Sequence, residues 1–510
     1  MADSKREIER KYEATTATRL PDLSRVAGVS AVAHQGVSDM DAVYYDTEDL
    51  RLMAGSLTLR RRTGGSDAGW HLKFPVATGI RDELRQPLSD TLPRPFAGLL
   101  RSRIRTSALV PVARLRTSRD VHHLLDTDGA LLAEVSVDTV RAERLTGTGA
   151  TADWTEIEVE LADDGDPAFL DAVEHRLRTA GIHPSALPSK LARALAETGP
   201  PEQHEHDRST SPATPPTTAG DHVLAYVRHQ TEAITDLDPA VRRDLPDSVH
   251  RMRVATRRLR SALRTYRKIL DRHVTDPVCD ELKWLATELG VERDQEVLEA
   301  RLRTALDRLP RTLTLGPVDA RLRLWSVARH GGSHRRTVAV LDGERYLALL
   351  ESLDALLAAP PLLPAASSAP GRALPRAVLK DYERLAARVA HALDLPPGHD
   401  RDLALHDARK AAKRARYAAE AARPALGKPA RRLARRMKAV QSLLGDHQDS
   451  VVAREALRTL AVQAHAAGEP TFTWGLLYGR EEAEAADRER ELPQVWHRAS
   501  RPRLRAALEG

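Results

Sequence analysis

The spacing of apolar residues changes once along this chain of 510 residues, at the stretch 199–220. That stretch, GPPEQHEHDRSTSPATPPTTAG, contains five prolines and almost no large apolar side chain, which is typical of a semi-stiff, disordered linker. Before it, in residues 1–198, short segments that alternate apolar and charged residues are separated by turn signals, and this predicts a β-rich domain. After it, in residues 221–510, alanine, leucine and arginine recur at helical spacing, which predicts an all-α domain. The expected fold class is therefore a multidomain α+β protein.

The helical part contains an internal repeat that constrains its architecture. VHRMRVATRRLRSALRTY, from Val249, matches LHDARKAAKRARYAAEAA, from Leu405, at an offset of 156 residues. LKWLATELGVERDQEV, from Leu282, matches MKAVQSLLGDHQDSVV, from Met437, at an offset of 155 residues. Because the register is kept in both matches, we predict two helical bundles related by a pseudo-twofold axis. The predicted boundaries are about 221–357 for the first half, 358–375 for a proline-rich separator and 376–510 for the second half.

The composition of the chain indicates what kind of partner it binds and in which cellular compartment it is found. The net charge of +6 favours an anionic partner. Cys279 is the only cysteine, which excludes an internal disulfide and fits the reducing cytosol. The first residues lack the apolar core of a signal peptide, and the most apolar later stretch, LLAAPPLLPAA, is broken by prolines and too short to span a bilayer. We therefore expect a cytoplasmic protein without a membrane partner.

In each candidate strand of the first domain, charged side chains share one face. In EIERKY, alternation places Glu7, Glu9 and Lys11 on one side and Ile8 and Tyr12 on the other. The charged faces of the later segments carry Arg60 and Arg62; Lys73; Arg81, Glu83 and Arg85; Arg114 and Arg116; Glu134 and Asp138; and Glu156, Glu158 and Glu160.

A sheet with one solvated, charged face is the common explanation of such a pattern. Two features of this sequence favour another explanation. The signs are sorted by strand, with acids in the first and last segments and bases between them, and bases on neighbouring strands repel one another unless an anion lies among them. A closed barrel whose charged face points inward accounts for both. Guanidinium groups bind phosphate oxygens and carboxylates hold Mg²⁺ or Mn²⁺, so the pattern predicts a metal-assisted polyanion site.

Seven segments in order carry a family resemblance: EIERKY, YYDTEDLRLMAGSLTLRRRTGG, WHLKFP, RDELRQPL, LRTSRDVHHLLDTDGALLAEVSVDTV, TEIEVEL and PSKLARAL. Together they resemble a CYTH domain of the triphosphate tunnel metalloenzymes, over roughly residues 5–198. The resemblance implies an eight-stranded antiparallel tunnel with flanking helices. It also implies a metal-dependent hydrolase of triphosphates, with Mg²⁺ or Mn²⁺ as cofactor and inorganic triphosphate as the main substrate.

The same resemblance assigns roles to individual residues. It implies catalytic roles for Glu7, Glu9, Lys11, Lys73 and Glu158. It implies substrate contacts from Lys11, Arg60, Arg62, Lys73, Arg85, Arg116, Arg119 and Lys190, with Arg114 close enough in sequence to compete with Arg116 and Arg119. It implies metal ligation by Glu7, Glu9, Asp138, Glu156, Glu158 and Glu160.

A basic stripe marks the repeated helix of the second domain. Offsets of 0, 3, 7 and 10 residues align His250, Arg253, Arg257 and Arg260 along one helical face. A single stripe of this kind is usually a solvated surface, but without acids at i+4 it repels itself. Because the stripe recurs in the second half, we favour a binding surface, to which KPARRLARRMK from Lys428 adds six bases.

The stripes, together with LGVERDQEV and LGDHQDSVV, resemble a CHAD domain over about residues 221–510. That family is helical, occurs fused to CYTH domains and is associated with binding inorganic polyphosphate, and Asp294 and Asp449 would orient neighbouring bases. The implied polyphosphate contacts are His250, Arg253, Arg257, Arg260, Lys283 and Arg293 in the first half, and His406, Arg409, Lys410, Lys413, Arg416, Lys438 and His447 in the second.

Three functions fit these features. The first is a triphosphatase coupled to a polyphosphate-binding helical domain, with association to polyphosphate granules. The second is a non-catalytic polyphosphate-granule protein, and the third is an adenylate cyclase of the CYTH type. Nucleic acid is disfavoured as the polyanion, because aromatics make up only 4% of the chain and leave little for base stacking.

Overall fold

The computed structural model describes residues 3–147, 149–199, 215–330 and 333–509. The chain divides into two compact units, Met1–Ala213 and Thr214–Gly510. Residues 200–214 of the predicted linker lie outside the described residues. The helical unit begins with helix α6 (Ala219–Arg242), which starts inside the stretch predicted as linker. It does so because Thr218 and Asp221 form a capping box that satisfies the first backbone amides of the helix.

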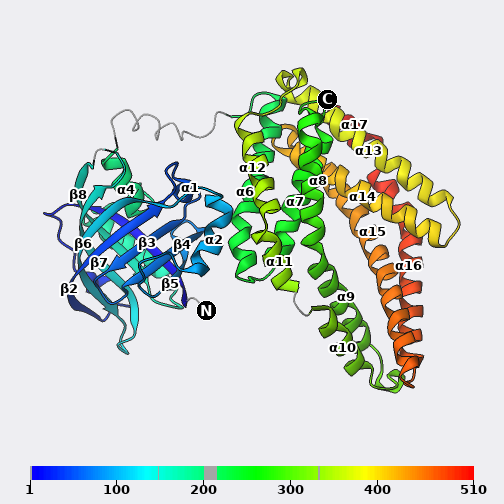
Figure 1. Ribbon diagram of the computed structural model, residues 1–510, viewed down its shortest axis with the longest axis horizontal. Helices are drawn as coiled ribbons and strands as arrows, with labels where there is room; N and C mark the ends of the chain where they lie inside the picture. Colours follow the sequence, from blue (N-terminus) through cyan, green and yellow to red (C-terminus); the bar gives the residue numbers. More distant parts are fainter. Residues whose placement is uncertain (1–2, 148, 200–214, 331–332, 510) are drawn as a thin grey trace. The chain divides into compact units, whose positions relative to one another are not determined.

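The first unit is built on a closed barrel of eight antiparallel strands (Figure 1), as predicted. Their order around the barrel is β1-β5-β4-β3-β2-β6-β7-β8. The strands are β1 (Asp3–Ala14), β2 (Ala31–Asp46), β3 (Thr58–Thr63), β4 (Gly69–Ala77), β5 (Ile80–Gln86), β6 (Val110–Leu125), β7 (Leu131–Arg144) and β8 (Thr151–Leu161).

Helices cover the apolar outer faces of these strands. Helix α3 (Ala168–Thr179) packs on a cluster that includes Tyr12, Val135 and Val159, and α2 (Arg94–Ile104), which follows the short helix α1 (Arg51–Ala54), packs on the outer side chains of β3, β4 and β5. The apolar residues of these two clusters lie outside the barrel wall, and alternation turns charged residues of the same strands inward.

One end of the barrel is packed by helix α4 (Lys190–Glu197). Its Leu191 and Leu195 share a buried cluster with Ala42, Leu115 and Ala142, which lie on the inward faces of their strands. The interior therefore changes along its length, from an apolar plug at the α4 end to a charged cavity beyond it.

The described elements of the second unit are helices, and the longest segment, α15, consists of two helices that meet at a kink at the non-helical Gly427 (φ 58°). Its helices after α6 are α7 (Ser248–Thr265), α8 (Arg272–Glu288), α9 (Gly290–Asp307), α10 (Val318–His330), α11 (Ser333–Asp342), α12 (Glu344–Ala358), α13 (Pro370–Asp394), α14 (His399–Ala421), α15 (Arg423–Ala466), α16 (Phe472–Ala499) and α17 (Pro502–Glu509).

The repeat is visible in the helices. Helices α6 and α7 correspond to α13 and α14. Helices α8 and α9 together correspond to α15. The first half has a break between α8 and α9, just before Gly290, whereas α15 continues through the matching Gly445. The two halves share one large core, since α7 packs on α14 and buried side chains such as Met252, Leu259 and Leu405 belong to the same cluster. Helix α13 begins at Pro370, inside the predicted separator.

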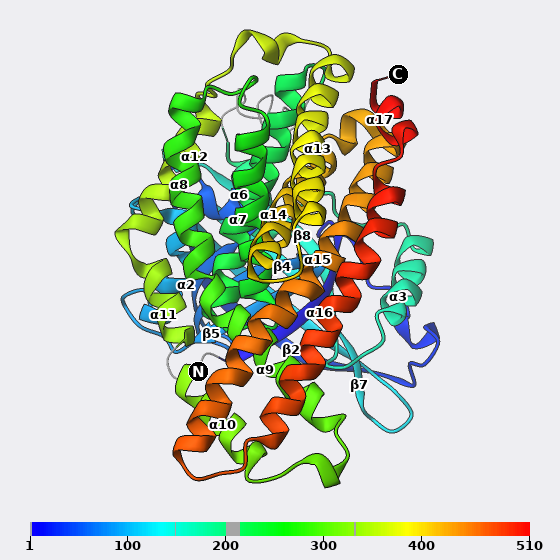
Figure 2. The same cartoon turned by 90° about the vertical axis from the view of Figure 1, so that its right-hand side faces the viewer.

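A smaller core joins α9, α10 and the neighbouring parts of α15 and α16, which run side by side (Figure 2). It contains Trp325 and Trp474. Across the described residues, none of these helices combines the length and hydropathy that crossing a lipid bilayer requires.

Candidate functional site

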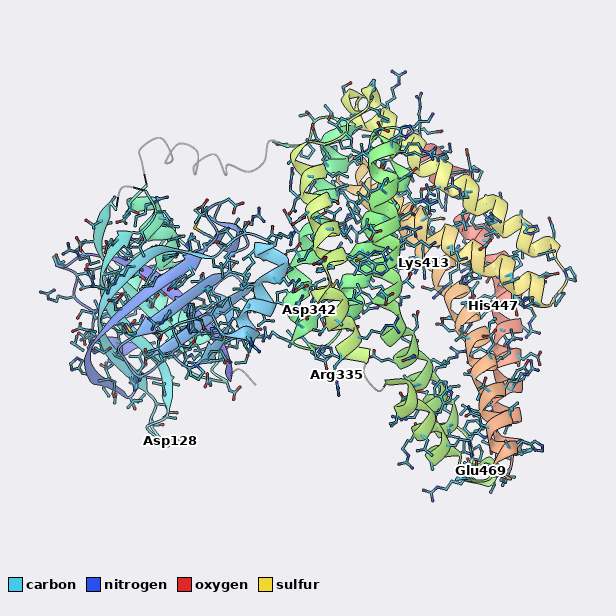
Figure 3. The ribbon with its side chains drawn as sticks, viewed as in Figure 1. Asp128, Arg335, Asp342, Lys413, His447 and Glu469 are labelled. Atoms are coloured by element: carbon cyan, nitrogen blue, oxygen red, sulfur yellow. The ribbon has the colours of Figure 1, made fainter. Side chains whose placement is uncertain are left out.

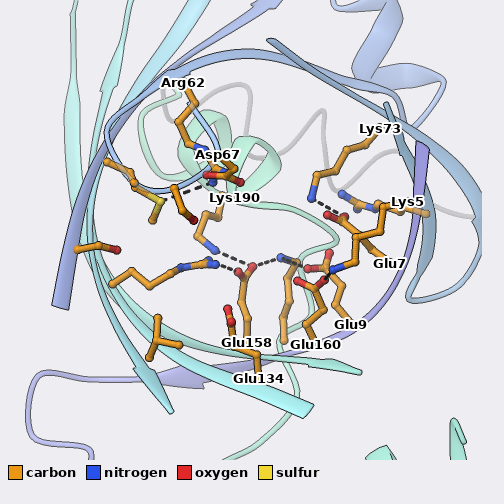
Figure 4. A pocket seen from close by; sticks show the side chains of 18 of the residues that line it. Lys5, Glu7, Glu9, Arg62, Asp67, Lys73, Glu134, Glu158, Glu160 and Lys190 are labelled. Atoms are coloured by element: carbon orange, nitrogen blue, oxygen red, sulfur yellow. Dashed lines mark hydrogen bonds and ion pairs between the residues drawn. The ribbon is translucent and has the colours of Figure 1, made fainter. Parts of the chain in front are cut away.

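A cavity of about 560 Å³ lies inside the barrel, and about half of the residues that line it are charged. The described lining includes nine basic residues: Lys5, Lys11, Arg60, Arg62, Lys73, Arg81, Arg85, Arg119 and Lys190. It also includes seven acidic residues: Glu7, Glu9, Asp67, Glu134, Glu158, Glu160 and Asp163. Strand alternation had placed Glu7, Glu9 and Lys11 on one face, and that face lines the cavity (Figure 4).

Lys190 binds a group of buried acids at the α4 end of the cavity. Its ammonium nitrogen lies 2.6 Å from Glu158, 2.8 Å from Glu156 and 2.9 Å from Asp138. Arg119 contacts Asp138 and Glu158 at 2.6 Å each, and Lys11 also pairs with Glu158.

Opposite charges decide the ionisation of this group. Burial would raise the pKa of Glu158, but Lys11, Lys190 and Arg119 outweigh burial and hold that pKa well below its ordinary value. Burial likewise opposes the charged form of Lys190, yet the surrounding carboxylates raise its pKa. Glu158 is therefore ionised and Lys190 is charged.

Glu83 is the centre of a second group. Strand alternation placed this residue on the charged face, but the sequence assigned no role to it. Its carboxylate is fully buried and accepts hydrogen bonds from Arg85 (2.5 Å) and His71 (2.9 Å). Lys73 and Arg60 lie 3.5 and 3.6 Å from it, and Lys73 also pairs with Glu7 at 2.5 Å. Despite burial, Lys73, His71 and Arg60 depress the pKa of Glu83, so this ionised acid holds three predicted phosphate ligands in place.

Three carboxylates on neighbouring strands form a row, called here the acid row: Glu9, Glu160 and Glu134. Glu9 lies directly opposite Glu160 between β1 and β8, and Glu160 lies directly opposite Glu134 between β8 and β7. Like charges opposite each other repel unless a cation lies between them. Among the described residues, Glu160 pairs with Lys5, Glu9 with Lys11 and Glu134 with His123. Hard oxygen ligands in this arrangement fit Mg²⁺ or Mn²⁺.

Of the predicted metal ligands, Glu9 and Glu160 belong to the acid row, whereas Asp138, Glu156 and Glu158 surround Lys190. The latter three place carboxylate oxygens within 4.8 Å of one another, which is also compatible with a metal. Glu7 lies with Lys73 and Arg85 instead. Sequence alternation had put Glu134 on the charged face, but only the barrel register shows that it extends the row.

The predicted phosphate ligands converge on the cavity with one exception. Arg60, Arg62, Lys73, Arg85, Arg119, Lys11 and Lys190 all line it. Arg116 does not: β6 is regular between residues 116 and 119, so the two side chains leave opposite faces, and Arg116 is half exposed outside the barrel, 3.7 Å from Asp41. We therefore correct the assignment of Arg116. Arg114 shares its outward face and pairs with Asp41 at 2.6 Å.

In the helical unit, the two basic stripes meet where α7 packs on α14. Arg253, Arg257, Arg409 and Lys413 form a cluster of half-buried cations. Burial and the nearby Arg257, Arg409 and Arg253 lower the pKa of Lys413 to about 7. The pKa of Arg257 is lowered by burial and by Arg253 and Arg409. Such mutual repulsion marks a place where an anion is favoured.

A pseudosymmetric pair of contacts fixes the outer arginines of this cluster. Arg253 crosses Gly290 and donates to Asp294 at 2.7 and 2.9 Å, and a β-carbon on Gly290 would lie 2.8 Å from the guanidinium. Arg409 approaches Gly445 and lies 3.8 Å from Asp449. The matching glycines and aspartates of the repeat thus position matching arginines.

A second basic cavity, of about 590 Å³, continues the first stripe along α7. Its described lining contains seven bases and two acids: Arg260, Arg264, Arg267, Arg272, Lys283, Arg384, Arg414, Asp276 and Asp280. Arg260 and Lys283 were predicted. Arg264 and Arg267 follow the same helical spacing and could have been, whereas Arg384 and Arg414 come from the other half of the repeat.

The remaining predicted polyphosphate contacts are scattered. His447 is buried rather than available, with its Nε2 atom 3.3 Å from Asp402 and 3.2 Å from Glu489, so we correct its assignment (Figure 3). Exposed positions are held by His250, Lys410 and Lys438, half-buried positions by His406 and Arg416, and the side chain of Arg293 lies outside the described part of the structure.

Family models match most of the chain. The CYTH domain model matches residues 5–195, and the CHAD domain model matches residues 225–458. These ranges fall on the barrel and on the helical unit respectively.

Whole-length relatives occur in Mycobacterium tuberculosis. The protein Rv2226 of strain H37Rv is 39% identical over 503 residues, which cover 95% of this chain and 94% of the relative, and MT2285 of strain CDC 1551 matches to the same extent.

Three solved structures are similar to parts of the chain. PptA from Streptomyces chartreusis is 24% identical, with a TM-score of 0.47, over 55% of this chain and all of that one. The CHAD domain from the plant Ricinus communis is 25% identical, with a TM-score of 0.45, over 58% of this chain and 93% of that one. The protein HpAC1 from Hippeastrum, described as an adenylyl cyclase homologue with a dominant triphosphatase activity, is 16% identical, with a TM-score of 0.23, over 38% of this chain and 98% of that one.

The two domain models and the full-length relatives agree with the two units of the structure. The chain belongs to the family of proteins that join a CYTH domain to a CHAD domain.

Proposed function

We propose that the barrel hydrolyses triphosphates, inorganic triphosphate foremost, with bound Mg²⁺ or Mn²⁺, and that the helical unit binds inorganic polyphosphate. CYTH domains act on triphosphate-type substrates and are metal-dependent. The observation that carries the proposal for this chain is the cavity itself, in which nine bases and a row of carboxylates converge inside a closed barrel.

Charge balance supports a metal. The nine bases of the lining face seven lining acids and three further acids in contact with them, Glu83, Asp138 and Glu156. The side chains of the cavity therefore nearly balance in charge, and a triphosphate entering alone would leave the cavity strongly negative. Divalent cations on the acid row would restore the balance.

The residues have distinct tasks in this proposal. Arg60, Arg119 and Lys190 bind and orient the phosphate oxygens with charge-assisted hydrogen bonds. The acid row would hold the metal, which would supply Lewis-acid stabilisation of the charge that develops on the transferring phosphoryl group. Glu9 and Glu158 stay ionised, because nearby cations hold the pKa of each below its ordinary value against burial, and can orient an attacking water.

For the helical unit, the proposal depends on the cation cluster and the second basic cavity. Arg257 and Lys413 lie among other cations, and the lining of the cavity has seven bases and only two acids. A flexible chain of phosphates could neutralise both at once. Such binding weakens steeply with added salt, because counterions are released on association.

The deciding experiment incubates the full-length protein with Mg²⁺ or Mn²⁺ and, in turn, tripolyphosphate, ATP, thiamine triphosphate and long-chain polyphosphate. Phosphate release and cyclic AMP are followed for the wild type and for Glu9→Gln. We expect phosphate release from tripolyphosphate that is abolished by Glu9→Gln and by a chelator. No turnover of any substrate with tight polyphosphate binding would identify a granule-binding protein, and cyclic AMP from ATP would identify a cyclase.

A further inference from the structure

A second group of metal-type ligands lies on the outer wall of the barrel. His34 on β2 is the direct cross-strand partner of His122 on β6, and Asp120 precedes His122 by two residues on the same face of β6. The two imidazole rings are 5.0 Å apart between centroids and tilted by 37°. A register shift in β2 between His34 and Gly36 interrupts the ladder beside them.

Both histidines aim the same ring nitrogen at one carboxylate. The Nε2 atom of His34 lies 2.7 Å from Oδ1 of Asp120, and the Nε2 atom of His122 lies 3.5 Å from Oδ2. One ligand atom from each residue can be chosen so that all three lie within 4.8 Å of one another.

The charge of Asp120 is not balanced by a permanent cation. Among the described residues Asp120 forms ion pairs with these two histidines alone, and neither histidine is charged unless it is protonated. One imidazole is enough to satisfy the carboxylate by a hydrogen bond at 2.7 Å. The imidazole of His122, at 3.5 Å, is too far for a good hydrogen bond, but it can serve as a third metal ligand beside His34 and Asp120.

The donor set selects the kind of ion. Two imidazole nitrogens and one carboxylate oxygen suit Zn²⁺, Cu²⁺ or Ni²⁺, whereas Mg²⁺ and Ca²⁺ prefer oxygen ligands. The side chains of His34, Asp120 and His122 are 58%, 40% and 22% exposed, so the ligands can close by small rotations and solvent can reach a fourth position.

We propose that His34, Asp120 and His122 form a metal site for Zn²⁺ or a similar borderline ion, separate from the cavity of the barrel. It lies on the opposite face of β6 from Arg119, which lines that cavity. The proposal does not depend on the activity of the barrel.

The test uses the full-length protein, freed of metal with a chelator and without a histidine tag, titrated with Zn²⁺ in excess Mg²⁺ so that the oxygen ligands of the cavity are occupied. We expect His34→Ala/His122→Ala to bind one Zn²⁺ fewer than the wild type, and Asp120→Asn to weaken that site by about tenfold or more. His175→Ala, which removes an exposed histidine on α3, is the matched control and should bind as the wild type.

Two further measurements depend on the same site. Zn²⁺ should raise the melting temperature of the wild type and raise that of the double variant less, because an ion that binds only the folded state stabilises it. The electron paramagnetic resonance spectrum of Cu²⁺ added at one equivalent should show two nitrogen ligands that the double variant lacks. Equal Zn²⁺ stoichiometry and an unchanged Cu²⁺ spectrum in the double variant would overturn the proposal.

Discussion

Lys190, at the start of helix α4, places its ammonium nitrogen 2.6 Å from Oε1 of Glu158 on strand β8. Asp138 and Glu156 lie within 3 Å of the same nitrogen, and all four residues are buried. One lysine therefore ties the helix that closes the barrel to the carboxylates of the cavity.

Replacing this lysine should destabilise the barrel. Lys190→Ala leaves three buried carboxylates with fewer cations, so we expect a loss of about 3 to 5 kcal/mol in the free energy of unfolding, measured by urea denaturation. Lys5→Ala is the control, because the partly exposed pair of Lys5 with Glu160 contributes about 1 kcal/mol or less. Equal losses in both variants would contradict the role assigned to Lys190.

Whether an arginine side chain points into the cavity or away from the barrel should determine its effect on substrate binding. Arg60→Ala removes a cavity cation and should cost about 2 kcal/mol, which is about a thirtyfold rise in KM for tripolyphosphate. Arg116→Ala is the matched control, since Arg116 lies on the outer face, and should leave KM unchanged. A comparable rise in KM for both variants would mean that phosphate binding does not depend on the cavity.

Glu83→Gln should destabilise the protein in the absence of ligand and increase the stabilisation that a bound anion provides. The variant leaves Arg60, Lys73 and Arg85 without their shared buried acid, so we expect a loss of about 3 kcal/mol in unfolding free energy. Tripolyphosphate should stabilise the variant more than the wild type in thermal melts, because it replaces the missing charge.

The same residue gives the wild type a pH dependence. The pKa of Glu83 is depressed in the folded state, so its contribution to stability is fully present above about pH 4.3, the pKa of an unfolded glutamate, and is lost as pH falls further. The difference in unfolding free energy between Glu83→Gln and the wild type should therefore shrink as pH falls below that value. A difference that stays constant would contradict this account.

Polyphosphate binding should weaken as pH rises through neutrality. The pKa of Lys413 is lowered to about 7 by burial and neighbouring arginines, and a bound anion would draw its proton back. We expect affinity to fall by up to about fivefold between pH 7 and pH 8, measured by isothermal titration calorimetry. Lys413→Arg, which keeps its charge, should bind with little pH dependence. An unfolded lysine holds its proton up to about pH 10.4, so this residue also makes the free energy of unfolding rise with pH between those two values.

The two matched glycines should respond differently to alanine. A β-carbon on Gly290 would lie 2.8 Å from Arg253 and would push the guanidinium from Asp294, whereas one on Gly445 meets Arg409 at an ordinary 3.5 Å. We expect Gly290→Ala to weaken polyphosphate binding by about 1 kcal/mol, about fivefold. Gly445→Ala should keep binding and stabilise α15 by up to about 1 kcal/mol. The same calorimetric titration and a urea denaturation curve for each variant check this.

Local patterns predicted the face on which many charged side chains lie, because such patterns depend only on backbone geometry. Alternation along β1 fixed which face carries Glu7 and Glu9, and helical spacing fixed the stripe of Arg253 and Arg257. The same rule shows that Arg116 and Arg119 cannot both face inward, but without the strand pairing the sequence did not say which one does.

What the sequence by itself determined is the two-part architecture, the internal repeat and the charged face of each strand, since these follow from residues close together along the chain. Only the tertiary structure decided which charges meet. Glu83 gathers Arg60 and Lys73, and His447 is enclosed by Asp402 and Glu489, through contacts between elements far apart in sequence. Strand order and helix packing set those contacts, because electrostatic interactions depend on distance and burial rather than on separation along the chain.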